Sequence, residues 1–205
     1  MKKILLVHGI FMRPPVLWLL AKRLRKAGYE VEIFDYPLFP REHHVVDAFI
    51  KKVTTSRPHV IIGHSLGGNI AMHQLSEIRG VVQTIICLGS PVAGSAIAKK
   101  ISEGIFSKLL SPTAHKMLTR AVVLNDSPQV VGIIAGIKNT FGFRLVFPVL
   151  SGESDGTVAL SETKIPNLLH HSQMNVGHTS MLLSRDVVNQ ITHFIEKGYF
   201  DDPVV

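Results

Sequence analysis

The sequence predicts an α/β fold, with a mostly parallel sheet of about six strands and helices on both faces. Short apolar runs of strand length alternate with longer segments whose apolar residues recur at helical spacing. Glycines and prolines separate these segments. The chain has 205 residues, of which 46% are hydrophobic, so it is long enough to bury the core of one domain. We therefore expect a single domain over residues 1–205.

The first half of the chain alternates regularly between strand-like and helix-like segments. Strands are expected at 3–7, 30–34, 59–63 and 82–88, and helices at 15–27, 42–53 and 66–78. Strands joined by such helices pair in parallel. The second half is less regular, with helical pieces at 96–101 and 115–123, strands at 130–135 and 169–175, and a last helix at 185–197. Residues 140–150 are ambiguous, because Gly142 and Pro148 interrupt a strand-like pattern.

The composition excludes several classes of protein. A single cysteine excludes an internal disulfide framework and a cysteine-rich metal cluster, and we expect neither metal nor cofactor. No apolar run approaches the ~20 residues of a membrane helix. The apolar run that starts at Ile4 stops at His8-Gly9, short of the ~7–15 residues of a signal peptide. We therefore expect a cytoplasmic protein.

The formal charge is +7, but only 18% of the residues are charged and the cations are scattered. Their densest run is Lys22, Arg23, Arg25 and Lys26, which is typical of the solvated face of one helix. We expect no nucleic-acid partner. Peripheral contact with an anionic membrane stays open, and the sequence leaves the oligomeric state unknown.

The strongest chemical signal is the run from Gly63 to Gly68, Gly-His-Ser-Leu-Gly-Gly. It matches the G-x-S-x-G nucleophile elbow and lies where that motif requires, after a strand and before a helix. Such a sharp turn lifts the Ser65 hydroxyl clear of the sheet, and small neighbours make room for it. The pattern predicts Ser65 as a nucleophile.

An acyl-transfer serine needs two N–H donors for the oxyanion. One of them is expected from the backbone N–H of Leu66, which directly follows the serine. The second is expected from the loop after the first strand, where Ile10 is the first candidate and Phe11 the second. His8 is expected to shape this loop rather than to transfer protons.

A carboxylate and a histidine should follow the serine in chain order. Asp155 begins a tight Asp-Gly turn and is the first candidate acid, with Glu153 as its rival. His178 is the first candidate base, because it lies beyond a strand and before the last helix. Parallel sheets bring such groups together at the carboxyl ends of their strands.

With these pieces, the chain resembles the α/β-hydrolases, and among them compact bacterial lipases and esterases related to inositol deacylases. The resemblance runs from Lys3 to about Phe200 and rests on five stretches, 6–10, 63–68, 88–91, 154–158 and 177–182. It implies a minimal α/β-hydrolase fold with Ser65 as nucleophile, Asp155 as acid and His178 as base. It also implies an oxyanion hole formed by the Ile10 and Leu66 backbone.

The sequence departs from many relatives at position 92, where Val92 replaces a histidine. Because the first expected strand begins at residue 3, we expect this chain to lack the two antiparallel strands that open larger hydrolases. Residues 92–128 form an insert too short for a large lid, and we expect a small cap over an acyl pocket. Apolar residues near the motifs predict the wall of that pocket: Phe11, Met12, Val92, Ile105 and Phe106.

These features predict a serine esterase or lipase acting on a small-molecule or lipid ester with a lipophilic acyl group. An acyltransferase or thioesterase would use the same serine with another acceptor or substrate. A non-catalytic lipid-binding protein of the same fold is the alternative from another class. The sequence does not reveal the ester class or the length of the acyl chain.

Overall fold

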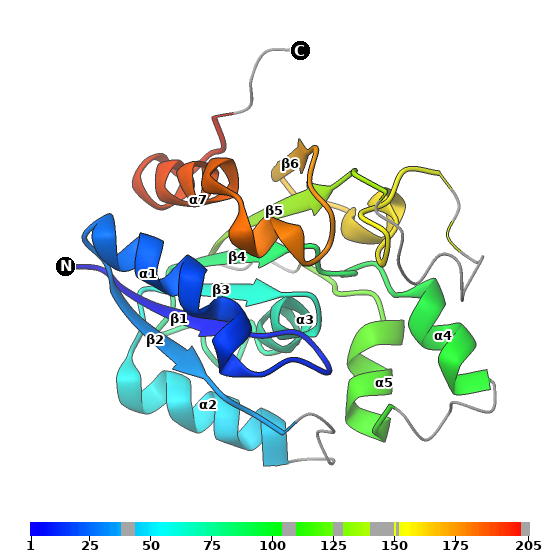
Figure 1. The fold of residues 1–205 in the computed structure, drawn as a ribbon. Helices are drawn as coiled ribbons and strands as arrows, with labels where there is room; N and C mark the ends of the chain where they lie inside the picture. The colour runs from blue at the N-terminus through cyan, green and yellow to red at the C-terminus, as the bar shows by residue number, and fades with distance from the viewer. Residues whose placement is uncertain (38–43, 104–109, 125–128, 140–149, 151, 202–205) are drawn as a thin grey trace.

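The computed structural model describes residues 1–37, 44–103, 110–124, 129–139, 150 and 152–201. Its centre is a six-stranded sheet in the order β2-β1-β3-β4-β5-β6 (Figure 1). The strands are β1 (Lys3–Val7), β2 (Glu30–Phe34), β3 (Val60–His64), β4 (Thr84–Leu88), β5 (Val130–Gly136) and β6 (His170–Met174). Each neighbouring pair is parallel. The predicted α/β class is confirmed.

The α-helices lie between the strands and after the last one. They are α1 (Trp18–Lys26), α2 (His44–Ser56), α3 (Leu66–His73), α4 (Ala96–Glu103), α5 (Pro112–Thr119) and α7 (Arg185–Lys197). Short 3-10 turns add η1 (Pro14–Leu17), η3 (Leu160–Thr163) and η4 (Ser180–Leu183). In the described part of the chain, every helix is too short or too polar to cross a membrane.

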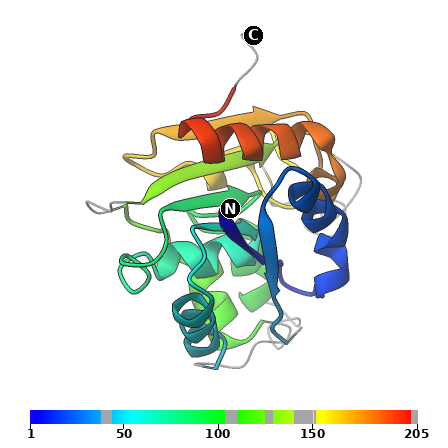
Figure 2. The same cartoon turned by 90° about the vertical axis from the view of Figure 1, so that its left-hand side faces the viewer.

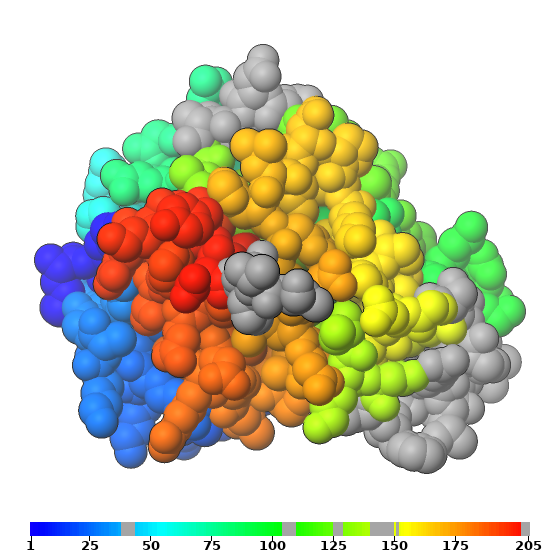
Figure 3. Space-filling view, turned by 90° about the horizontal axis from the view of Figure 1, so that it is seen from above, coloured from blue at the N-terminus to red at the C-terminus, as the bar shows by residue number. Residues whose placement is uncertain are grey.

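The helices cover both faces of the sheet. Helices α1 and α7 lie on one face, and α2 and α3 lie on the other (Figures 1 and 2). Figure 3, seen from above relative to Figure 1, shows α7 between α1 and the residues around β6. Two hydrophobic clusters follow this division, one with Phe194 of α7 and one with Phe49 of α2. The sheet is therefore buried on both sides, as its apolar strands require.

Some expected bounds differ from the structure: the helical piece expected at 115–123 is α5, Pro112–Thr119. Helix α3 ends at His73, although apolar spacing favoured a helix to Ile78. Leu75 and Ile78 are nevertheless buried, because the turns after α3 bring them to the same core. The ambiguous segment 140–150 lies outside the described residues except for Leu150, which is buried.

The parallel sheet places the candidate site. Because all strands point the same way, their carboxyl ends share one edge. Ser65 follows β3 directly, Asp155 lies between β5 and β6, and His178 comes four residues after β6 ends at Met174. Residues far apart in the chain therefore meet at this edge.

Candidate active site

Ser65 occupies the turn between β3 and α3 in a conformation that is rare for residues with a side chain. Its φ is 53° and its ψ is −121°. A positive φ at a non-glycine residue is strained and marks functional turns. The Ser65 N–H donates to the Leu88 carbonyl of β4 at 2.9 Å, which holds the turn against the sheet.

The glycines around Ser65 permit backbones to pack where a side chain could not. A Cβ at Gly63 would lie 2.4 Å from the Gly68 nitrogen. A Cβ at Gly67 would lie 2.4 Å from the Val7 carbonyl oxygen. Real Cβ atoms do not approach backbone so closely, so the elbow requires glycine at both positions.

Asp155 and His178 form a buried hydrogen-bonded pair. His178 Nδ1 lies 2.7 Å from Asp155 Oδ2. The other carboxylate oxygen accepts from the N–H groups of Thr157, at 2.9 Å, and Val158, at 2.7 Å. The His178 N–H also donates to the Asp155 carbonyl at 2.9 Å. These bonds hold the carboxylate and the imidazole in one relative orientation. Since a carboxylate accepts, Nδ1 carries a proton, and in the neutral ring the lone pair is then on Nε2.

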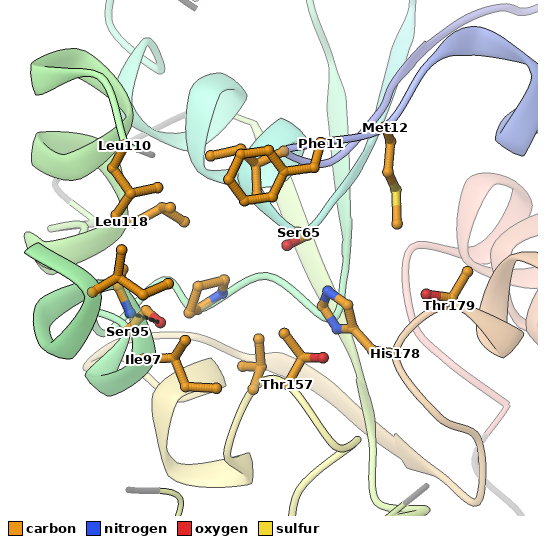
Figure 4. A pocket seen from close by; sticks show the side chains of 15 residues that line it. Phe11, Met12, Ser65, Ser95, Ile97, Leu110, Leu118, Thr157, His178 and Thr179 are labelled. Carbon is orange, nitrogen blue, oxygen red and sulfur yellow. Dashed lines mark hydrogen bonds between the residues drawn. The ribbon is translucent and has the colours of Figure 1, made fainter. Parts of the chain in front are cut away.

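Ser65 and His178 line the same cavity, which has a volume of about 280 Å³. Figure 4 shows the Ser65 hydroxyl and the His178 ring side by side, facing apolar side chains of the insert. The structure therefore brings Ser65, Asp155 and His178 to one site. The rival acid, Glu153, is exposed.

The loop after β1 forms another side of the cavity, where Ile10 and Phe11 lie. Within the described residues, neither the Ile10 N–H nor the Leu66 N–H donates to a backbone carbonyl. His8 Nδ1 donates to the Gly9 carbonyl at 2.9 Å, and the Tyr36 N–H donates to His8 Nε2 at 3.3 Å. Because a trans peptide is planar, fixing the Gly9 carbonyl also fixes the direction of the Ile10 N–H.

His8 therefore shapes the loop, as its position in the sequence suggested. Its ring is fully buried and stacks on Tyr36 with a centroid distance of 4.0 Å. Burial lowers the pKa of His8, and the bond to Gly9 opposes that shift. The ring is thus suited to a fixed neutral state.

The structure places some of the predicted wall residues in the lining of the cavity. Phe11 and Met12 line the cavity (Figure 4). Val92 packs in the core instead, and Pro91 takes that place in the lining. The chain turns after Pro91, and the Val92 carbonyl accepts from the Val122 N–H at 2.7 Å, which keeps residue 92 under the insert. Ile105 and Phe106 lie outside the described residues.

The insert lines the cavity with α4, α5 and their flanks. Its lining residues are Ser95, Ile97, Ala98, Ile101, Leu110 and Leu118. Two buried polar residues hold it: Asn69 Nδ2 donates to the carbonyls of Pro91, at 3.1 Å, and Met117, at 2.8 Å. Glu162 Oε1 accepts from the Ala96 N–H at 2.6 Å, at the start of α4. The described part of the insert thus borders the cavity that holds Ser65.

Sequence reasoning missed several residues of this site. Ile97 and Ile101, four residues apart on α4, could have been found from their helical spacing. Thr157 and Thr179 lie two and one residues after Asp155 and His178 and line the cavity, but nothing in the sequence distinguishes them. Within the described ranges, no three His, Cys, Asp or Glu side chains group to hold a metal ion.

Comparison with known proteins agrees with this fold. The mature form of Bacillus licheniformis lipase BlEst2 superposes with a TM-score of 0.68 at 18% identity, over 95% of this chain and 91% of that one. The metagenomic carboxyl esterase MGS0156 gives 0.68 at 15% identity, over 86% of this chain and 64% of that one. The ydeN gene product from B. subtilis superposes with a TM-score of 0.64 at 16% identity, over 96% of this chain and 100% of that one.

At these identities the structural likeness establishes the fold. No curated protein matches the chain. The inositol-deacylase branch stays a prediction of the sequence. A family model described as the alpha/beta hydrolase family matches residues 4–130, which is more than half of the chain. The chain therefore belongs to the alpha/beta hydrolase family.

Proposed function

We propose that this chain is a serine hydrolase that cleaves carboxylic esters with a lipophilic acyl group, using Ser65, His178 and Asp155. The observation that carries the proposal is the Asp155–His178 pair, with Oδ2 and Nδ1 2.7 Å apart, beside a strained serine in one cavity. Family membership and the fold shared with a lipase and an esterase support a hydrolase.

In this mechanism, Ser65 Oγ attacks the ester carbonyl carbon and His178 Nε2 takes its proton. The Ile10 and Leu66 N–H groups bind the oxyanion. The carbon–oxygen bond to the alcohol then breaks, and the alcohol leaves with the proton from His178. A water molecule activated by the same histidine attacks the acyl-enzyme and releases the acid. Asp155 fixes the tautomer of His178 and stabilises its charged form.

The cavity supports an acyl group of short to medium length. Its volume of about 280 Å³ is near the lower end of ligand pockets, which hold ~300–1,000 Å³. Most of its lining is apolar, with Phe11 and Met12 from the first loop and isoleucines and leucines from the insert. We propose residues 92–128 as a small cap that supplies this wall.

The test has two parts. A fluorophosphonate probe should add once to the folded chain, and Ser65→Ala should abolish the adduct. A panel of p-nitrophenyl acetate, butyrate, octanoate and palmitate should then give the highest kcat/KM for butyrate or octanoate. Absence of labelling in folded protein would contradict the proposal and favour a non-catalytic lipid binder.

The same panel separates the related activities. Acyl thioesters replace the esters in one arm, and an added alcohol acceptor competes with water in another. Faster release from thioesters would identify a thioesterase. Transfer to the alcohol in preference to water would identify an acyltransferase.

A further inference from the structure

His64 is the last residue of β3 and directly precedes Ser65. Its side chain is buried, with 1% of its surface exposed, and it does not line the cavity. It lies beneath the site, and a Cβ at Gly9 would stand 3.0 Å from its Nδ1 and 3.1 Å from the Ser65 Cβ. The proposed mechanism gives this histidine no role.

The ring of His64 reaches the loop that carries His178. Its Nε2 lies 2.8 Å from the His178 carbonyl oxygen, although the two residues are 114 positions apart. Because a carbonyl only accepts, Nε2 must carry the proton. Nδ1 then holds a lone pair, and it has no hydrogen-bond partner among the described residues. The structure thus specifies one neutral tautomer.

This bond completes the anchoring of His178. Asp155 holds the His178 N–H through its carbonyl and Nδ1 through its carboxylate. His64 holds the remaining main-chain group, the carbonyl. The third bond runs to the element that carries Ser65, so it ties the base to the nucleophile rather than to the acid.

The charge state of His64 suits this role. Burial, and then repulsion from His178, lowers the pKa of His64 to about 3. The two rings have a centroid distance of 4.7 Å. A charged His64 would oppose the imidazolium that forms on His178 during attack, whereas a neutral donor holds the loop without that cost.

We propose that His64 is a positioning residue whose Nε2–H, bonded to the His178 carbonyl, keeps the His178 imidazole in reach of Ser65. The inference rests on the proposed function, since it assigns a role within that reaction. A displacement of ~1 Å at a reacting group costs about 100-fold in rate. Loss of the bond should therefore lower kcat, and KM should stay unchanged because His64 does not line the cavity.

Two substitutions separate the hydrogen bond from the ring. His64→Phe keeps a planar ring and removes the donor, and kcat for p-nitrophenyl butyrate should fall about 100-fold. His64→Gln places an amide N–H near the Nε2 position and should recover most of that loss. His59→Phe is the matched control, because His59 Nδ1 accepts from the Lys3 N–H at the opposite edge of the sheet. It should leave kcat unchanged.

The outcomes distinguish the two proposals. If the wild type neither hydrolyses esters nor reacts with the fluorophosphonate, the proposed function is wrong. If the wild type is active and folded His64→Phe keeps its kcat, only the positioning role is overturned. The positioning role is also overturned if His64→Gln is folded but has no higher kcat than His64→Phe. It is overturned as well if the two His64 variants raise KM and leave kcat intact.

A measurement on the wild-type protein covers the case in which His64→Phe does not fold. Imidazole nitrogen NMR, with the His64 signals assigned by their loss in His64→Gln, reports the tautomer directly. The proposal requires a neutral ring with its proton on Nε2 at neutral pH. A proton on Nδ1, or a cationic ring, would overturn it.

Discussion

At the scale of single residues, Asp155 shows how a loop prepares a carboxylate. One oxygen accepts two main-chain N–H groups and the other accepts from His178. The side chain is 1% exposed, so its orientation depends on these bonds and not on water. Glu153, two residues earlier, is exposed.

We predict that Asp155→Asn lowers kcat about 10⁴-fold, because an amide cannot hold the tautomer that leaves Nε2 free to act as base. Glu153→Gln should leave kcat near that of the wild type. Steady-state rates with p-nitrophenyl butyrate check both variants, with circular dichroism to show that each is folded. A larger loss of kcat in Glu153→Gln than in Asp155→Asn would mean that Glu153, and not Asp155, is the acid.

Gly89, just after β4, has a φ of +55° and lies against the pair. A Cβ there would stand 2.9 Å from Asp155 Oδ2 and 3.1 Å from His178 Nδ1. We predict that Gly89→Ala lowers kcat at least ~10-fold by pushing the two groups apart. Gly28→Ala is the control, since Gly28 has a φ of +94° with nothing within 4 Å of its Cβ position.

Both alanines are strained by a positive φ and should cost ~1–2 kcal/mol of stability. Thermal unfolding measures the loss of stability that the two variants share. Enzyme kinetics measures the loss of kcat that is expected in Gly89→Ala alone. Equal loss of activity in the two variants would mean that backbone strain alone, and not the contact with the pair, causes the effect.

The sequence was sufficient to name Ser65, Asp155 and His178 as candidates, because each lies in a recognisable local context and in the expected chain order. It could not indicate the hydrogen bond of His64, since that bond joins residues 114 positions apart and depends on how two loops meet. Local pattern identifies the groups that react. Tertiary packing decides which others hold them.

At the scale of elements, helical spacing predicted where helices lie better than which side they bury. Within the helix expected at 15–27, apolar spacing alone allows Leu19 to face the core, yet Leu19 is 37% exposed, and Leu17, Leu20 and Leu24 are buried. Hydrophobic residues nearly surround the first turn of α1, so their helical spacing alone is compatible with two orientations of the helix on the sheet. Contact with η4 and α7 selects one of them.

The insert offers a test of the acyl wall. Ala98 of α4 lines the cavity with a small side chain. We predict that Ala98→Leu fills part of the space and lowers kcat/KM for the octanoate ester, with little effect on the acetate ester. Each methylene that loses its buried site costs ~0.8 kcal/mol, or about fourfold in kcat/KM.

Lys100→Leu is the matched control, because it adds the same side chain to the exposed side of α4. Lys100→Leu should leave the ratio of kcat/KM for the octanoate ester to kcat/KM for the acetate ester unchanged. A common loss with both esters in Ala98→Leu would point to damage to the helix, and the acyl wall would then have to lie elsewhere.

At the scale of the whole molecule, two fully buried histidines make folding sensitive to acid. His8 and His64 lie under the site, and burial lowers the pKa of both, in His64 to about 3. The unfolded chain binds a proton at these residues below pH 6.5, the ordinary value. The folded chain does so only at lower pH. Protons therefore favour the unfolded state in between.

We predict that the free energy of unfolding falls as the pH drops from 6.5 toward 3, by up to ~1.4 kcal/mol per pH unit through His64, and the lowered pKa of His8 acts in the same direction. Urea titrations at several pH values measure this slope. Buried Glu162 acts in the opposite sense, because burial raises its pKa above 4.5, so the folded state holds that proton more tightly than the unfolded chain.

Comparison with His64→Gln isolates one histidine from these other groups, because Glu162, His8 and the surface carboxylates are common to both proteins. Glutamine does not titrate, so its stability profile should be flatter than that of the wild type over the same range. The difference should start near pH 6.5, the ordinary histidine value, and grow on acidification. Parallel profiles would mean that His64 binds its proton equally well in the folded and unfolded chains, which contradicts a buried neutral ring bonded to the His178 carbonyl.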